Sequence, residues 1–135
     1  MAQTLSPGFQ KLLREPAHCQ LATLMPDGSP QVTQTWVDTD GQYILINTAD
    51  GRQKVRNVRR DPRVAVNVVD PGNAFRLASV RGRVVEVTTE GADAHIDRLA
   101  QRYLGQETYP LRTPSEQRVI LKIEPAKINA SGLDD

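Results

Sequence analysis

The sequence predicts a mainly β fold, a closed or half-closed antiparallel barrel with three short helices. Six or so short apolar runs are joined almost everywhere by tight turns, which is typical of antiparallel strands and not of alternating strand–helix–strand units. With 135 residues and 15.0 kDa, the chain is long enough for a single domain over residues 1–135 with one modest core. Because a sheet of this size buries only a thin core, we expect the protein to dimerise.

The first element expected is a short N-terminal helix. Ser6 is suited to cap it, because a serine side chain accepts a hydrogen bond from the first turn of a helix, and Pro7 is favoured in that turn. Leu12 and Leu13 would face inward, and Pro16 would end the helix.

Three strands are expected next. Residues 18–24 and 30–37 predict a hairpin, since Pro26-Asp27-Gly28 between them is a turn sequence. Residues 42–47 predict a third strand that is apolar enough to be buried on both faces. The simplest arrangement of these three strands is an antiparallel meander.

A basic helix follows these strands. Val55 and Val58 lie three residues apart, which is a helical spacing, and cations occupy most of the other positions. Asp61-Pro62 would end the helix, because the residue before a proline disfavours the helical conformation.

The middle of the chain predicts two more strands. Apolar residues alternate over residues 64–68, and a turn at residues 71–73 leads into a long strand over residues 75–88. Gly82 lies inside this long strand, which indicates a bulge or the close approach of another backbone.

The last third of the chain predicts one helix and one strand. The helix has a continuous apolar stripe and ends at Gly105. A final strand over residues 118–124 is interrupted by Pro125, and residues 127–130 are expected to continue the sheet. The stripe consists of Ile96, Leu99, Ala100, Tyr103 and Leu104.

The composition bears on membranes and on location. No apolar segment approaches the ~20 residues needed to cross a bilayer, so we expect no membrane partner. The first ten residues lack a basic stretch followed by an apolar core, so no secretory signal is expected. Cys19 is the single cysteine, which excludes an intrachain disulfide and favours a cytoplasmic location.

The reactive side chains of the sequence do not form a catalytic group. Cys19 lies in a strand pattern, where a buried structural thiol is the expected role, and His18 would point to the opposite face of that strand. His95 lies between two aspartates of the apolar-striped helix and is expected to be a surface histidine. No metal-ligand spacing is found, so we expect no metal site and a cofactor that supplies any chemistry.

The basic segment, residues 51–63, has six cations and one anion. Its net charge is +5, while the rest of the chain sums to −4. The segment follows a strand that ends at Asn47-Thr48, and its helix opens with Arg52 and Lys54. Helix N–H groups, the positive end of the helix dipole and two cations would therefore converge, which predicts a phosphate site.

Two other interpretations of the basic segment stay open, a solvated helix face and a nucleic-acid surface. The second is disfavoured because the chain has six aromatic residues, none in this segment, so few bases could stack; we expect no nucleic-acid partner. Trp36 is either a core residue or a platform for a planar ring, and its position in the sequence does not decide between them.

Six stretches of the chain form an ordered series that is typical of one protein family. The stretches are residues 28–32, 34–37, 47–57, 59–64, 80–84 and 103–105. Each stretch alone is a weak match, whereas the ordered series is specific. Taken in order, they resemble the flavin- and deazaflavin-binding split β-barrel family, the pyridoxamine 5′-phosphate oxidase-like proteins. The likeness is strongest to the coenzyme F420-dependent oxidoreductase branch and extends from about residue 9 to about residue 130.

The resemblance implies a split antiparallel β-barrel of the FMN/F420-binding type, in a homodimer with two cofactors at the interface. On the family pattern, Arg52 and Lys54 bind the cofactor phosphate. Asn57 and the strand end at Asn47 and Thr48 would support that phosphate site.

The same resemblance implies contacts with the cofactor ring. Gln31, Gln34 and Trp36 would lie along the ring edge, and Phe75 matches the position from which the partner subunit contributes an aromatic side chain. The vitamin B6 oxidases of the family end in a substrate-binding segment that contains Arg and Trp, and residues 123–128 contain neither. Oxidation of pyridoxamine phosphate is therefore not expected.

The activity that the resemblance implies is hydride transfer between F420 and a small conjugated or quinone-like substrate. F420 has a phosphorylated polyglutamate tail and is more anionic than FMN, so the +5 segment favours F420. FMN is the alternative cofactor, in an oxidoreductase or in a flavin-binding or storage protein. A haem or tetrapyrrole binder is a third hypothesis, for which neither His18 nor His95 is well placed. No residue of the chain is expected to be catalytic, because positioning and exclusion of water would do most of the work.

Overall fold

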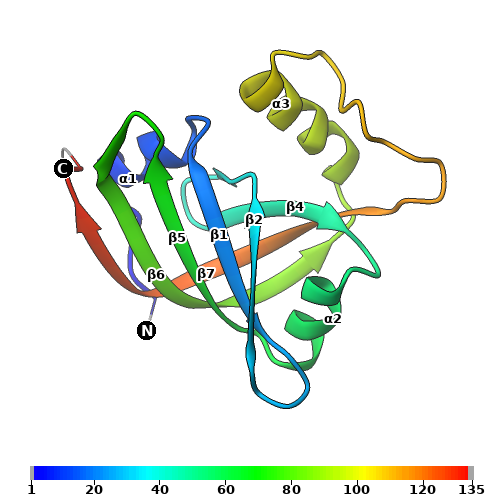
Figure 1. The fold of residues 1–135 in the computed structure, drawn as a ribbon, viewed down its shortest axis with the longest axis horizontal. Coiled ribbons are helices and arrows are strands. Elements are labelled where there is room, and N and C mark those ends of the chain that lie inside the picture. The colour runs from blue at the N-terminus through cyan, green and yellow to red at the C-terminus, as the bar shows by residue number, and fades with distance from the viewer. Residues whose placement is uncertain (1, 134–135) are drawn as a thin grey trace.

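A computed structural model describes residues 2–133 and shows one curled antiparallel sheet with short helices around it (Figure 1). Within these residues the sheet has seven strands in the order β2-β1-β5-β6-β7-β4-β3. This is a half-closed barrel, so the predicted mainly β fold is confirmed. The strands are β1 (His18–Leu24), β2 (Pro30–Thr35), β3 (Asp38–Thr39), β4 (Ile44–Ala49), β5 (Arg63–Asp70), β6 (Asn73–Thr88) and β7 (Arg118–Ser131), and the helices are α1 (Pro7–Leu13), α2 (Gln53–Arg60) and α3 (Ala92–Leu104).

Helix α1 packs against β3 and β5 at one end of the barrel. The Ser6 hydroxyl accepts a hydrogen bond from the backbone N–H of Phe9 at 3.2 Å, so the expected cap is present. Phe9, Leu12 and Leu13 are at most 1% exposed. These side chains belong to the main core cluster, which they share with the inward-facing residues of the sheet.

The two longest strands, β6 and β7, form the spine of the sheet. Their pairing shifts register beside Gly82, and a Cβ atom there would overlap the carbonyl oxygen of Glu124. Both the bulge and the close backbone approach expected at Gly82 are therefore confirmed. β7 runs on through Pro125, which lies at this irregularity and therefore does not end the strand.

The hairpin of β1 and β2 is confirmed, but the predicted three-strand meander is wrong. β4 pairs with β3 and β7 and does not touch the hairpin as a sheet neighbour, because β5 occupies the free edge of β1. All six residues of β4 are buried, as expected. Ile44 and Ile46 face the main core, whereas Leu45 packs with Ala92 of α3 and Ile120 of β7 on the other face.

Helix α3 covers the outer face of β4 and β7 (Figure 1). It ends at Gly105, which has the left-handed conformation, with φ 70°. The predicted apolar stripe is buried at Ile96, Leu99 and Ala100, while Leu104 at the end of the helix is 48% exposed. Among the helices of residues 2–133, none combines the length and the apolar character that a membrane span needs.

Candidate functional site

A cavity of about 400 Å³ lies where β2 and β4 end and where α2 and β7 begin. Two loop residues, Tyr109 and Leu111, lie at its rim. A larger cavity of about 780 Å³ lies elsewhere, on strands β1, β5, β6 and β7, and none of the nine predicted site residues lines it. We take the smaller cavity as the candidate site, because unpaired buried polar groups open into it.

Six of the nine predicted site residues meet at the smaller cavity. They come from the end of β2, the end of β4 and the start of α2, three segments that the fold brings together. The six are Gln34, Trp36, Asn47, Thr48, Arg52 and Lys54.

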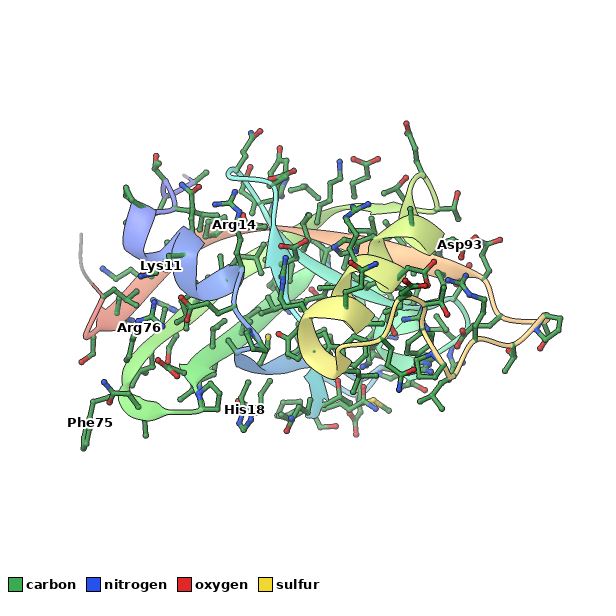
Figure 2. All side chains as sticks on the ribbon, turned by 90° about the horizontal axis from the view of Figure 1, so that it is seen from above. Lys11, Arg14, His18, Phe75, Arg76 and Asp93 are labelled. Atoms are coloured by element: carbon green, nitrogen blue, oxygen red, sulfur yellow. The ribbon has the colours of Figure 1, made fainter. Side chains whose placement is uncertain are left out.

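The other three predicted residues do not line this cavity. Gln31 and Asn57 lie behind it, where the Asn57 amide, which is fully buried, donates to the Thr23 hydroxyl at 2.9 Å and so ties α2 to β1. Phe75 is 81% exposed and points into solvent at the opposite end of the molecule from Asp93 of α3 (Figure 2). Its predicted contact with a cofactor would have to be made in a neighbouring subunit.

Three cations, Arg52, Lys54 and Arg118, line the site, and two of them share one carboxylate. Glu116 Oε1 lies 3.1 Å from Arg118 Nη1 and 3.6 Å from Arg52 Nη2. Burial lowers the pKa of the third cation, Lys54, and the neighbouring positive charges of Arg52 and Arg118 lower it further. The local excess of positive charge is the condition under which a bound anion is stabilising.

The start of α2 adds to this positive character. The chain turns at Gly51, whose φ is 91°, and the helix begins after Arg52, with no side chain of the described residues capping it. The first N–H groups of such a helix have no acceptor within the helix and favour an anion. Arg52 and Lys54 both line the cavity beside the end of β4, as expected for the two cations.

Three residues that line the cavity have a buried polar atom without a hydrogen-bond partner in the described structure. Two of these atoms are the hydroxyl groups of Thr35 and Thr48. The third is Arg118 Nη1, which forms an ion pair with Glu116 but is outside hydrogen-bond geometry. Because buried polar groups are almost always satisfied, these atoms mark where polar ligand atoms would bind.

An aromatic cluster forms another wall of the cavity. The Trp36 ring stacks on Tyr103 with centroids 5.0 Å apart and planes 8° apart, and Tyr109 meets it edge-on at 5.8 Å. The Tyr103 hydroxyl donates to the Ala17 carbonyl at 2.8 Å and accepts from the backbone N–H of Val37 at 3.1 Å. Burial raises the pKa of Tyr103 to about 12. Trp36 is therefore a half-buried, rigidly held wall residue.

Sequence reasoning missed half of the cavity lining. Arg118 is the most informative of the missed residues, because it pairs with Ala49 at the end of β4 and thereby reaches the site. The position of Arg118 at the site follows only from the pairing of β4 with β7. The sequence did contain one signal of a special role, because Arg118 is a charged residue at the start of an apolar strand. The missed lining residues are Thr35, Ile96, Leu104, Tyr109, Leu111 and Arg118.

The prediction that His95 is a surface residue is wrong. Its side chain is 1% exposed, because it lies on the buried face of α3, one turn from Leu99. The predictions for β1 are confirmed: Cys19 is fully buried, with a pKa that burial raises to about 11, and His18 faces solvent. Within residues 2–133 no cluster of His, Cys, Asp and Glu could hold a metal ion.

The geometry defines a class of protein, a split-barrel fold with a cavity lined by cations and aromatic side chains. The family model of pyridoxamine 5′-phosphate oxidase matches residues 5–132 of the sequence. The chain belongs to this family.

Solved structures agree with the family. One structure, named F420 reductase, is 33% identical to this chain, with a TM-score of 0.78. The match covers 92% of this chain and 98% of the other chain. A conserved hypothetical protein from Mycobacterium tuberculosis is 24% identical over 96% of this chain and 86% of its own, with a TM-score of 0.69. General stress protein 26 from Bacillus anthracis is 15% identical over 94% and 93%, with a TM-score of 0.68. The last two support the fold alone.

Proposed function

We propose that this protein is an oxidoreductase that uses coenzyme F420 and acts on a small conjugated or quinone-like substrate. The observation that carries the proposal is the excess of cations at the start of α2, beside an aromatic wall of the same cavity. The 33% identity to a structure named F420 reductase supports the choice of cofactor.

The residues of the chain would hold and shield the cofactor. Arg52, Lys54 and the first N–H groups of α2 would bind its phosphate, and the Thr48 hydroxyl would supply a further polar contact. Trp36 and Tyr109 would keep water from the ring. The cofactor supplies hydride transfer when bound, and the residues that line the cavity include no carboxylate or imidazole to act as acid or base.

FMN is the second candidate cofactor, because it offers the same kind of phosphate and the family is that of pyridoxamine 5′-phosphate oxidase. An FMN-bound form would be either an oxidoreductase or a flavin-binding or storage protein. Oxidation of pyridoxamine phosphate itself is not part of the proposal, since residues 123–128 lack the Arg and Trp expected for it. These residues belong to β7 and pair with the neighbouring strands β4 and β6.

A haem-binding function has little support. His18 faces solvent on β1, and both ring nitrogens of His95 have partners in the buried core, at 3.0 Å from Asp38 Oδ2 and 3.1 Å from Asn47 Nδ2. Neither imidazole lines the cavity.

The proposal includes a cytoplasmic homodimer with two cofactors at its interface. The exposed ring of Phe75 and the cavity of about 780 Å³ over β1, β5 and β6 are surfaces on which a second subunit would fit. Family membership supports a dimer, and the buried free thiol of Cys19 agrees with a reducing compartment.

Fluorescence titration of the purified protein with F420 and with FMN tests the function. We expect the wild type to bind F420 and to oxidise its reduced form when a quinone or an enone is added. Lys54→Ala should weaken binding by about 10-fold or more, because a hydrogen bond to a charged group is lost. Lys11→Ala is the matched control, since Lys11 is exposed on α1, does not line the cavity, and lies at the opposite end of the molecule from Asp93 of α3 (Figure 2). Tight FMN binding without measurable F420 affinity would refute the choice of F420.

A further inference from the structure

Arg118 has an unusual environment for a cation. It is only 3% exposed, and its guanidinium lies 5.0 Å from the centre of the Tyr109 ring. Its Nε donates to the side-chain oxygen of Asn47 at 2.9 Å, while Nη1 forms an ion pair with Glu116 Oε1 at 3.1 Å but has no partner in hydrogen-bond geometry in the described structure. Glu116 offsets part of the charge, and a buried N–H without a hydrogen-bond acceptor still favours a ligand oxygen.

The orientation of the Asn47 amide is determined by its partners. Its oxygen accepts from Arg118, so the other atom of the amide must be the nitrogen, and that nitrogen donates to the Ala92 carbonyl at 2.9 Å. The same nitrogen lies 3.1 Å from Nδ1 of His95. Both the oxygen and the nitrogen of the Asn47 amide therefore have hydrogen-bond partners within the protein.

These contacts determine the tautomer of His95. Because Asn47 offers a donor, His95 Nδ1 must accept, and the ring hydrogen is then on Nε2, which donates to Asp38 Oδ2 at 3.0 Å. Burial raises the pKa of Asp38, but hydrogen bonds from His95 and Arg102 and the Thr39 backbone N–H outweigh it and hold the pKa below its usual value. Asp38 is therefore an ionised acceptor at one end of a continuous buried chain of hydrogen bonds.

We propose that Arg118 is a further anion-binding residue of the cavity, and that His95 is a positioning residue that holds it there through Asn47. The proposal rests on the proposed function, in that the anion is the phosphate of the bound cofactor. It changes the predicted role of Asn47, whose amide would orient Arg118 instead of touching the cofactor. Three segments distant in sequence, α3, β4 and β7, would then act together on one phosphate.

Paired ligands that differ in the phosphate test the role of Arg118. FMN is compared with riboflavin, and F420 with its chromophore without the phosphate-bearing tail. We expect Arg118→Ala to weaken binding of the phosphorylated member by about 10-fold or more and to leave its partner unchanged. Arg118→Lys should restore only part of the affinity, because lysine has no Nε–H to donate to Asn47.

Two substitutions at His95 separate the ends of the chain of hydrogen bonds. His95→Asn retains an acceptor toward Asn47 and loses the donor to Asp38, whereas His95→Gln retains the donor and loses the acceptor. We expect His95→Asn to keep most of the phosphate-dependent affinity and His95→Gln to lose several-fold of it. Both are measured on protein whose circular dichroism matches the wild type, so that a general loss of structure is not mistaken for a local effect.

The outcomes distinguish this inference from the proposed function. A wild type that binds neither phosphorylated ligand would overturn both. A wild type that binds one of them, together with an Arg118→Ala variant of equal affinity for it, would overturn the role of Arg118 alone. If a His95 variant lost as much affinity for the phosphate-free ligand as for the phosphorylated one, the positioning role would be overturned. Equal affinities of His95→Asn and His95→Gln for the phosphorylated ligand would overturn it as well.

Discussion

The ammonium group of Lys54 is the residue-scale feature with the clearest pH consequence. Burial and two neighbouring guanidinium groups lower its pKa. The group therefore loses its proton at a lower pH than an exposed lysine does, and with that proton it loses its attraction for phosphate.

We predict that affinity for a phosphorylated cofactor falls as the pH rises toward the ordinary lysine range, with the fall beginning below that range because the pKa of Lys54 is lowered. Lys54→Arg should flatten this part of the profile, because arginine stays charged throughout. FMN or F420 titrations at several pH values provide the measurement. If the wild type and Lys54→Arg lost the same affinity at alkaline pH, the titrating group would not be Lys54, and the prediction would be wrong.

At the scale of single elements, the pairing of β6 with β7 depends on Gly82, which has no side chain. A Cβ atom at Gly82 would meet the backbone of Glu124, which cannot move without disturbing the pairing. We predict that Gly82→Ala lowers the free energy of unfolding by about 1–3 kcal/mol. Gly72→Ala is the control, because its Cβ would meet only the Asp70 side chain, at 3.4 Å, and urea denaturation of both variants should show a loss at position 82 alone.

Elements that depend on local sequence were predicted well. The capped start of α1, the bounds of β1, the glycine at the end of α3 and the irregularity at Gly82 all follow from residue types within a few positions. The prediction of a three-strand meander was wrong because strands that pair can be far apart in the sequence. β4 pairs with β7, and the paired residues are 69 to 79 positions apart in the chain, so no short-range pattern predicts the pairing.

Most of the candidate site that was predicted from the sequence lies in one continuous segment of the chain. Residues 47–54 form one strand end and one helix start, so their convergence could be inferred from a single segment. Arg118 and Tyr109 reach the cavity only through tertiary pairing. His95 was within reach of the pattern, since it lies three residues after Ala92 and four before Leu99, but the flanking aspartates obscured it.

At the scale of the whole molecule, the exposed ring of Phe75 makes the oligomeric state testable. We predict that light scattering at micromolar concentration gives twice the 15.0 kDa of one chain. Phe75→Ala should weaken cofactor binding although the residue is distant from the cavity of its own chain. A 15.0 kDa particle that still binds cofactor with full affinity would contradict a shared site.

The position of β7 between β6 and β4 sets an order of assembly during protein synthesis. Until residues 118–131 have left the ribosome, β4 and β6 each have an unpaired edge, and the guanidinium of Arg118 is missing from the cavity. A nascent chain that stalls in the loop before β7 would expose two apolar strand edges to neighbouring chains. Insertion of β7 therefore joins β4 to β6 in one sheet and completes the cavity at the same time.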